Sequence, residues 1–157
     1  GRTGCDMLPA TIATLADHPK VAAVKEATGS IARGQTVIAA CAGKEIDVLS
    51  GDDATAMALT MAGGNGVISV VSNIAPNRMA SIITAANKGQ MEEACELNYQ
   101  LLPLMDLLFV ESNPIPVKAA MAHLGFGANE LRLPLCPLSQ DALEPILAEM
   151  AKLGIVR

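Results

Sequence analysis

The sequence predicts an α/β fold in which the strands are parallel. Three short, mostly apolar runs, at 21–25, 46–50 and 66–71, alternate with helical patterns, and only a few residues separate them. This β-α-β-α-β-α order is typical of parallel strands joined by right-handed crossovers. Hydrophobic residues make up 51% of the chain, yet it has no Trp, one Tyr and two Phe. Aliphatic residues and Met must therefore build the core, as they often do in helix-covered parallel sheets.

The composition excludes several classes of function. With 157 residues, the chain forms one domain or part of one. A net charge of −5 argues against a nucleic-acid partner, because phosphate binding requires a basic surface. The four scattered cysteines indicate reduced thiols in a cytosolic protein rather than a disulfide framework or a zinc site. No apolar run approaches the ~20 residues of a membrane helix, and no signal-peptide pattern is present. We therefore expect no membrane partner and a cytoplasmic location.

Local signals place the elements of the first part of the chain. Pro9 and Pro76 suit the first turn of a helix. Ser30 is placed to cap one helix, and Asp52 or Asp53 to cap the next. In chain order we expect a helix over 8–16, a strand over 21–25, a helix from 30 to about 42, a strand over 46–50, a helix over 54–61, a strand over 66–71 and a helix from 76 to about 88.

The alternation stops after Gly89. Residues 90–110 form one long helical pattern, which we expect to bend at Pro103. A Pro-rich turn then precedes a helix that ends near residue 124, and a last helix is predicted over 141–153. The chain accordingly divides into an α/β part, 1–89, and a helical extension, 90–157.

Lys25 is the candidate catalytic residue. It ends the strand over 21–25, whose other residues are apolar, and a Thr-Gly turn follows. An apolar floor beneath a lysine disfavours the charged ammonium, because burial removes it from water. A neutral amine is a nucleophile that forms a Schiff base with a carbonyl compound. The alternatives are a lysine that only extends to solvent or one that pairs with Glu26, although alternation puts these two residues on opposite faces of the strand.

The ends of successive parallel strands bring further groups toward Lys25. In such folds the loops after the carboxyl ends of the strands carry the chemistry. Gly51 follows the second strand and Ile68 lies in the third. Arg2 would follow a strand upstream of the first residue. Because an arginine can grip a carboxylate with two hydrogen bonds, an amine beside it suggests chemistry on a 2-oxo acid such as pyruvate.

Four longer motifs, preceded by Arg-Thr-Gly at 2–4, make this interpretation specific. They are Lys-Glu-Ala-Thr-Gly at 25–29, Leu-Ser-Gly-Asp-Asp at 49–53, Gly-Gly-Asn-Gly-Val-Ile-Ser-Val at 63–70 and Phe-Val-Glu-Ser-Asn-Pro-Ile-Pro-Val-Lys at 109–118. In this order and spacing they closely resemble the C-terminal half of the dihydrodipicolinate synthase (4-hydroxy-tetrahydrodipicolinate synthase) family of Schiff-base-forming pyruvate aldolases and lyases. The likeness covers essentially the whole chain. It implies the C-terminal half of a (β/α)8 TIM barrel followed by a three-helix C-terminal extension.

The resemblance also implies roles for individual residues. Lys25 matches the lysine that condenses with pyruvate, and Arg2 matches the arginine that binds a substrate carboxylate at the site entrance. Gly51 matches the glycine whose backbone approaches the second substrate. Ile68 matches the residue whose backbone carbonyl faces the lysine amine. Asn113 belongs to a segment packed near the site, behind the residues that touch substrate.

The reaction that the resemblance implies is the condensation of pyruvate with L-aspartate-4-semialdehyde to 4-hydroxy-tetrahydrodipicolinate, in the diaminopimelate route of lysine biosynthesis. The lysine imine acts as the electron sink, so the scheme requires no cofactor and no metal. The resemblance further implies a homotetramer in the cytoplasm.

The sequence departs from the family in two respects. Ser112 stands where the family usually has proline, which frees a φ angle that proline would fix. The family's proton relay uses tyrosines and a threonine from the first half of the barrel, whereas the one tyrosine here, Tyr99, lies in the helical extension. Three strands cannot close a barrel of ~250 residues. We therefore expect a fragment that is inactive alone and whose partner is the N-terminal half of the same barrel.

Two other functions stay open from the sequence alone. A sibling Schiff-base pyruvate lyase, such as an N-acetylneuraminate or keto-deoxy-sugar aldolase, shares the lysine but usually lacks Lys-Glu-Ala-Thr-Gly together with the Arg-Thr-Gly turn. A non-catalytic barrel relative, kept for assembly or regulation, would gain no covalent adduct from pyruvate. Asp52 and Asp53 are interpreted as helix caps rather than acids, and Glu26 as a structural hydrogen-bonding residue that faces the covering helices.

Overall fold

The structure, a computed structural model, describes residues 3–156. In chain order, the elements in that range are α1 (Pro9–Leu15), β1 (Ala23–Glu26), α2 (Ile31–Ala40), β2 (Asp47–Ser50), α3 (Asp53–Met61), β3 (Gly66–Val67), the 3-10 helix η1 (Val71–Asn73), α4 (Pro76–Asn87), α5 (Met91–Leu107), α6 (Ile115–His123) and α7 (Gln140–Lys152). None of the helices in this range is both long enough and apolar enough to cross a membrane.

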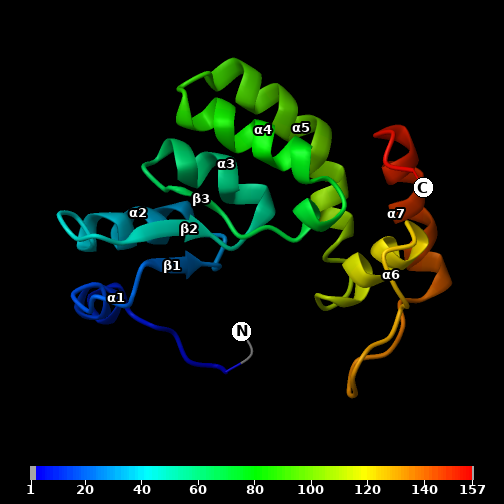
Figure 1. Cartoon of the computed structure of the whole chain (residues 1–157), viewed down its shortest axis with the longest axis horizontal. Helices are drawn as coiled ribbons and strands as arrows, with labels where there is room; N and C mark the ends of the chain where they lie inside the picture. The colour runs from blue at the N-terminus through cyan, green and yellow to red at the C-terminus, as the bar shows by residue number, and fades with distance from the viewer. Residues whose placement is uncertain (1–2, 157) are drawn as a thin grey trace.

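The three strands form one parallel sheet in the order β1-β2-β3. The residues of β1 and β2 pair in register, so that Lys25 lies beside Leu49 and Glu26 beside Ser50. One face of the sheet is covered: Glu26 and Ser50 are buried, and α2 and α3 lie on that side (Figure 1). On the other face Ala23 and Lys25 are exposed. The helices α2 and α3 therefore pack on one face of the sheet, and Lys25 lies on the other face (Figure 1).

The predicted order of helices and strands is confirmed, with helix ends within about three residues of their predicted positions; the largest difference is at the end of α5, predicted at 110 and observed at Leu107. The strand predictions were less accurate. The first strand is Ala23–Glu26 rather than 21–25, so Glu26 and not Lys25 is its last residue. The third strand, predicted over 66–71, is wrong in length, because only Gly66 and Val67 pair with β2. Its β-branched residues favour an extended backbone, but the chain turns into η1 at Val71.

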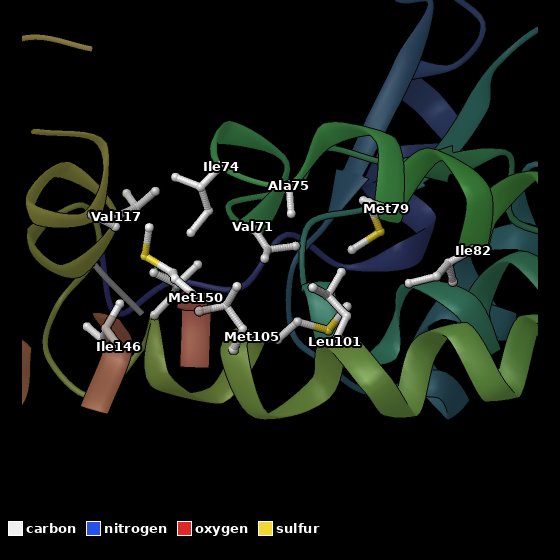
Figure 2. Packing of buried hydrophobic residues seen from close by; sticks show 13 residues of the cluster. Val71, Ile74, Ala75, Met79, Ile82, Leu101, Met105, Val117, Ile146 and Met150 are labelled. Carbon is white, nitrogen blue, oxygen red and sulfur yellow. The ribbon is translucent and has the colours of Figure 1, made fainter. Parts of the chain in front are cut away.

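A large apolar cluster joins the sheet-bearing part to the helical part (Figure 2). Figure 1 shows α4 and α5 side by side beyond α3, with α6 and α7 toward the C-terminal end. The cluster takes residues from η1, α4, α5, α6 and α7, among them Val71, Met79, Leu101, Leu104, Val117 and Ile146. Residues on both sides of Gly89 therefore share one core.

A second, smaller cluster lies under the covered face of the sheet. Ile12 and Ala16 of the α1 segment pack with Val37 and Cys41 of the α2 segment, and Val48 of β2 completes the group. The contact between α2 and α3 is close, because a Cβ atom at Gly34 would lie 2.4 Å from Cδ1 of Leu59. These contacts pack β2, and Val24 of β1, against the helices.

Candidate active site

The carboxyl ends of the three strands lie in one row. The backbone N–H of Gly51 donates to the carbonyl of Glu26 at 2.7 Å, and the N–H of Ile68 donates to the carbonyl of Ser50 at 2.8 Å. These hydrogen bonds extend the sheet ladder one residue past β2 and β3. The structure therefore brings three predicted site residues, Lys25, Gly51 and Ile68, to the same edge of the sheet.

The stem of the Lys25 side chain lies against Gly51. A Cβ atom at Gly51 would lie 2.6 Å from Cε and 2.8 Å from Cγ of Lys25, and also 2.6 Å from Cβ of Ala27. Gly51 does not have a positive φ angle, unlike nine other glycines of the described range. Space for the lysine, rather than an unusual backbone conformation, therefore accounts for a glycine at this position.

Lys25 and Glu26 point to opposite faces of β1, as predicted. Lys25 is exposed on the open face, whereas Glu26 is only 6% exposed on the covered face. The two side chains do not form an ion pair, because Glu26 pairs instead with Arg33 of α2. The Lys25 side chain therefore lies on the open face of the sheet, opposite the Glu26–Arg33 pair.

The carboxylate of Glu26 is the centre of a polar network behind Lys25. Its Oε1 accepts the backbone N–H of Thr28 at 2.8 Å, and its Oε2 accepts Nε of Arg33 at 2.9 Å. Arg33 also pairs with Asp6 at 2.8 Å and donates to the carbonyl of Met7. Burial alone would raise the pKa of Glu26, but the hydrogen bonds from Thr28 and the charge of Arg33 lower the pKa below its ordinary value.

The same network fixes the turn after β1. Because Thr28 and Glu26 are joined by a hydrogen bond, the Thr-Gly turn is held close to the end of β1. Through Asp6 and Met7, Arg33 also holds the segment before α1 against the start of α2. The predicted structural role of Glu26 is confirmed, whereas the sequence reasoning missed Arg33.

The two aspartates after β2 have different roles. Asp52 is the N-cap of α3, and its Oδ2 accepts the N–H and the hydroxyl of Thr55 at 3.1 and 2.7 Å. Asp53 is only 2% exposed, and its Oδ2 accepts the backbone N–H groups of Val70 and Val71. The predicted capping role is therefore confirmed for Asp52. Asp53 instead accepts hydrogen bonds from the backbone of the segment that follows β3.

Of the other two predicted site residues, Arg2 lies outside the described residues, and Asn113 is not part of this row. Asn113 is half-buried in the turn that precedes α6. Within residues 3–156, no group of three His, Cys, Asp or Glu side chains is arranged so that it could hold a metal ion.

Comparison with known proteins identifies the family. The model of the dihydrodipicolinate synthetase family matches residues 1–152. The chain belongs to this family. It is 46% identical to the 4-hydroxy-tetrahydrodipicolinate synthase of Citrifermentans bemidjiense, covering 99% of this chain and 53% of the relative. It is 45% identical to the enzyme of the same name from Thermodesulfovibrio yellowstonii, covering 100% and 54%. The chain thus spans about half the length of the curated relatives it matches.

Solved structures of dihydrodipicolinate synthases have the same fold. The enzyme from Thermotoga maritima superposes with a TM-score of 0.93 at 41% identity, covering 98% of this chain and 53% of that one. The chloride-inhibited enzyme from Acinetobacter baumannii, solved with pyruvate, gives a TM-score of 0.90 at 39% identity, covering 96% and 52%. The predicted fold class, the C-terminal half of a (β/α)8 barrel with a helical extension, is confirmed. In a (β/α)8 barrel the helices cover the outer side of the strands, so the helix-covered face of this sheet corresponds to the outer side and the open face to the interior side.

Proposed function

We propose that this chain provides the Schiff-base half of a lyase that condenses pyruvate with L-aspartate-4-semialdehyde to 4-hydroxy-tetrahydrodipicolinate, in the diaminopimelate route to lysine. The observation that carries the proposal is the place of Lys25, at the carboxyl end of a parallel strand with its stem against Gly51. The names of the curated relatives support the same reaction, as does the pyruvate complex of the Acinetobacter baumannii relative.

In this proposal the residues at the strand ends have separate roles. Lys25 is the nucleophile, and the backbone of Ile68 holds its amine ready. Gly51 admits the lysine stem and lets the second substrate approach the backbone. Arg2 binds a substrate carboxylate, and Asn113 supports the site from the side of the extension.

The reaction would proceed through covalent intermediates on Lys25. The neutral amine attacks C2 of pyruvate, water leaves, and an imine forms. Loss of a proton from C3 gives an enamine, because the imine nitrogen accepts the electron pair. C3 of the enamine then adds to the aldehyde carbon of the semialdehyde. Finally the amino group of the second substrate attacks C2, which closes the ring and releases the Lys25 amine.

We infer that the active form is a complete barrel, in which the N-terminal half of the same barrel covers the open face of the sheet. The exposure of Lys25 and of Ile68 on that face supports this arrangement. We further propose a cytoplasmic homotetramer that needs no cofactor, and we expect the 157-residue chain to be inactive by itself.

Borohydride trapping tests the proposal. The complete barrel, meaning this chain together with an N-terminal half of the same family, is incubated with pyruvate and reduced, and its peptides are mapped. We expect a pyruvate adduct on the peptide that contains Lys25 and none in a Lys25→Met variant. Turnover of aspartate semialdehyde, with N-acetylneuraminate as the competing substrate, then tests the reaction. Absence of the adduct, or turnover of N-acetylneuraminate alone, contradicts the proposed function.

A further inference from the structure

Asp53 connects two loops that carry proposed site residues. It begins α3, two residues after Gly51, so its backbone belongs to the loop after β2. Its Oδ2 accepts the N–H groups of Val70 at 3.0 Å and of Val71 at 2.7 Å. These two residues follow Ile68 in the loop after β3. One buried carboxylate therefore ties the Gly51 loop to the Ile68 loop.

The position of the Ile68 segment depends on this tie. Val70 and Val71 lie beyond the last residue of β3, where no neighbouring strand receives their N–H groups. A buried N–H group without a hydrogen-bond partner destabilises the folded state, and Val71 is fully buried in the large apolar cluster. Asp53 supplies the missing acceptor and so stabilises the turn from β3 into η1. Ser69 and Ser72 close the same turn with two further hydrogen bonds.

The other oxygen of the Asp53 carboxylate adds no hydrogen bond to this contact. Oδ1 of Asp53 is buried and has no hydrogen-bond partner within residues 3–156. Among these residues, the hydrogen bonds of the Asp53 side chain are therefore the two that Oδ2 accepts from Val70 and Val71. An asparagine could retain that acceptor through its amide oxygen, whereas an alanine could not.

We infer that Asp53 is a positioning residue, which sets the places of Gly51 and Ile68 around the Lys25 amine. The inference rests on the proposed function, since those three residues form the proposed site. Misplacement of a reacting group by about 1 Å can reduce a rate about 100-fold. We expect Asp53→Ala to lower kcat at least about tenfold, and Asp53→Asn to retain kcat within about threefold of the parent because it keeps the acceptor.

The measurement must separate positioning from loss of folded protein. Exhaustive trapping with pyruvate and borohydride counts the lysines that can form the imine, and kcat is expressed per trapped lysine in the complete barrel. Leu59→Val, in the same helix, serves as a control for stability, because Leu59 is buried but packs against α2 and the α3–β3 turn. Hydrogen exchange at Val70 and Val71 reports the tie itself, independently of catalysis.

The expected result has three parts. Asp53→Ala lowers kcat per trapped lysine and speeds exchange at the two valine amides, Asp53→Asn preserves both, and Leu59→Val leaves kcat per trapped lysine unchanged. Asp53→Ala with the parent kcat per trapped lysine overturns the inference while the proposed function stands. A parent protein that gains no pyruvate adduct on Lys25 overturns the proposed function and, with it, the inference.

Discussion

The side chain of Lys25 occupies the space that a side chain at Gly51 would need. Lys25 lies in β1 and Gly51 directly follows the neighbouring strand β2; the N–H of Gly51 donates to the carbonyl of Glu26, the residue after the lysine. A Cβ atom at Gly51 would approach two atoms of the lysine stem and Cβ of Ala27 to 2.6–2.8 Å, whereas real Cβ atoms do not come closer than about 3 Å to such neighbours. The conformation of the lysine therefore depends on a glycine beside it.

Gly51→Ala should displace the lysine. The flexible Lys25 stem can move aside, but Cβ of Ala27 is fixed to the backbone, so the backbone at Gly51 or Ala27 must shift as well, and both movements take the amine from its place at the strand end. We expect kcat of the complete barrel to fall at least about tenfold, with a loss of about 1–3 kcal/mol in the free energy of unfolding from overpacking. Borohydride trapping of pyruvate and denaturant unfolding measure the two effects.

Gly34→Ala is the matched control. It also adds one methyl group at a crowded site, since its Cβ would lie 2.4 Å from Leu59, but the contact is between α2 and α3, behind the sheet. We expect a comparable loss of stability with kcat per trapped lysine unchanged. An equal decrease of kcat per trapped lysine in both variants would contradict a specific role of Gly51.

Acid should weaken the network behind the lysine. The folded-state pKa of Glu26 is lowered, so its contribution to stability is present above the unfolded pKa of about 4.3 and is lost as the pH falls through the folded pKa. Glu26→Gln should therefore lower stability near neutral pH and reduce the decline of stability below about pH 4.3. Denaturant midpoints from about pH 3 to pH 7 measure this, with the exposed Glu45→Gln as control. Parallel profiles for Glu26→Gln and the parent would contradict it.

Local signals in the sequence were sufficient to predict the helices. Pro76 marks the start of α4 and Gly89 its end, because each acts on the backbone at its own position. Proline fixes its φ angle, and Gly89 adopts a positive φ angle just after the helix. The same holds for Ser30, which accepts the N–H of Arg33 at the start of α2. The resemblance of the motifs then predicted the family, and also that the chain corresponds to the C-terminal half of the barrel.

Contacts between distant residues explain what the sequence did not predict. The β-branched run from Val67 to Val71 favours a strand, but Asp53, 17 and 18 residues earlier than the two amides it binds, draws the backbone into a turn. Two adjacent aspartates at a helix start are equivalent in the sequence, and only packing shows that Asp52 caps α3 while Asp53 is buried. Arg33 likewise binds Asp6, 27 residues away, and no local pattern indicates that pair.

The N-cap of α2 should contribute measurably to stability. Oγ of Ser30 accepts the N–H of Arg33 at 3.3 Å, whereas Ser139, the N-cap of α7, makes no capping hydrogen bond. We expect Ser30→Ala to lower the free energy of unfolding by about 1 kcal/mol and Ser139→Ala to change it by less than about 0.5 kcal/mol. Thermal and denaturant unfolding of the two variants provide the comparison. A larger loss in Ser139→Ala would contradict the assignment of the cap.

The α/β part, 1–89, and the helical extension, 90–157, should unfold together. Leu104 of α5 is fully buried in the large cluster, where it shares a core with Met79 of α4 and Ile146 of α7. Leu104→Ala should therefore lower the free energy of unfolding by about 2–5 kcal/mol, and the loss should reach the sheet, because α3 packs against both α2 and the α4–α5 pair. The buried thiol of Cys41, beneath the sheet, can report on the first part.

The measurement follows helix content and the reactivity of Cys41 during denaturant unfolding. If the two parts form one cooperative unit, both signals change at the same denaturant concentration, and Leu104→Ala shifts both midpoints equally. Leu133→Ala is the control, because Leu133 is 92% exposed and its truncation should leave both midpoints in place. A shift in helix content without a shift for Cys41 would show that residues 1–89 keep their structure when the core of the extension is weakened.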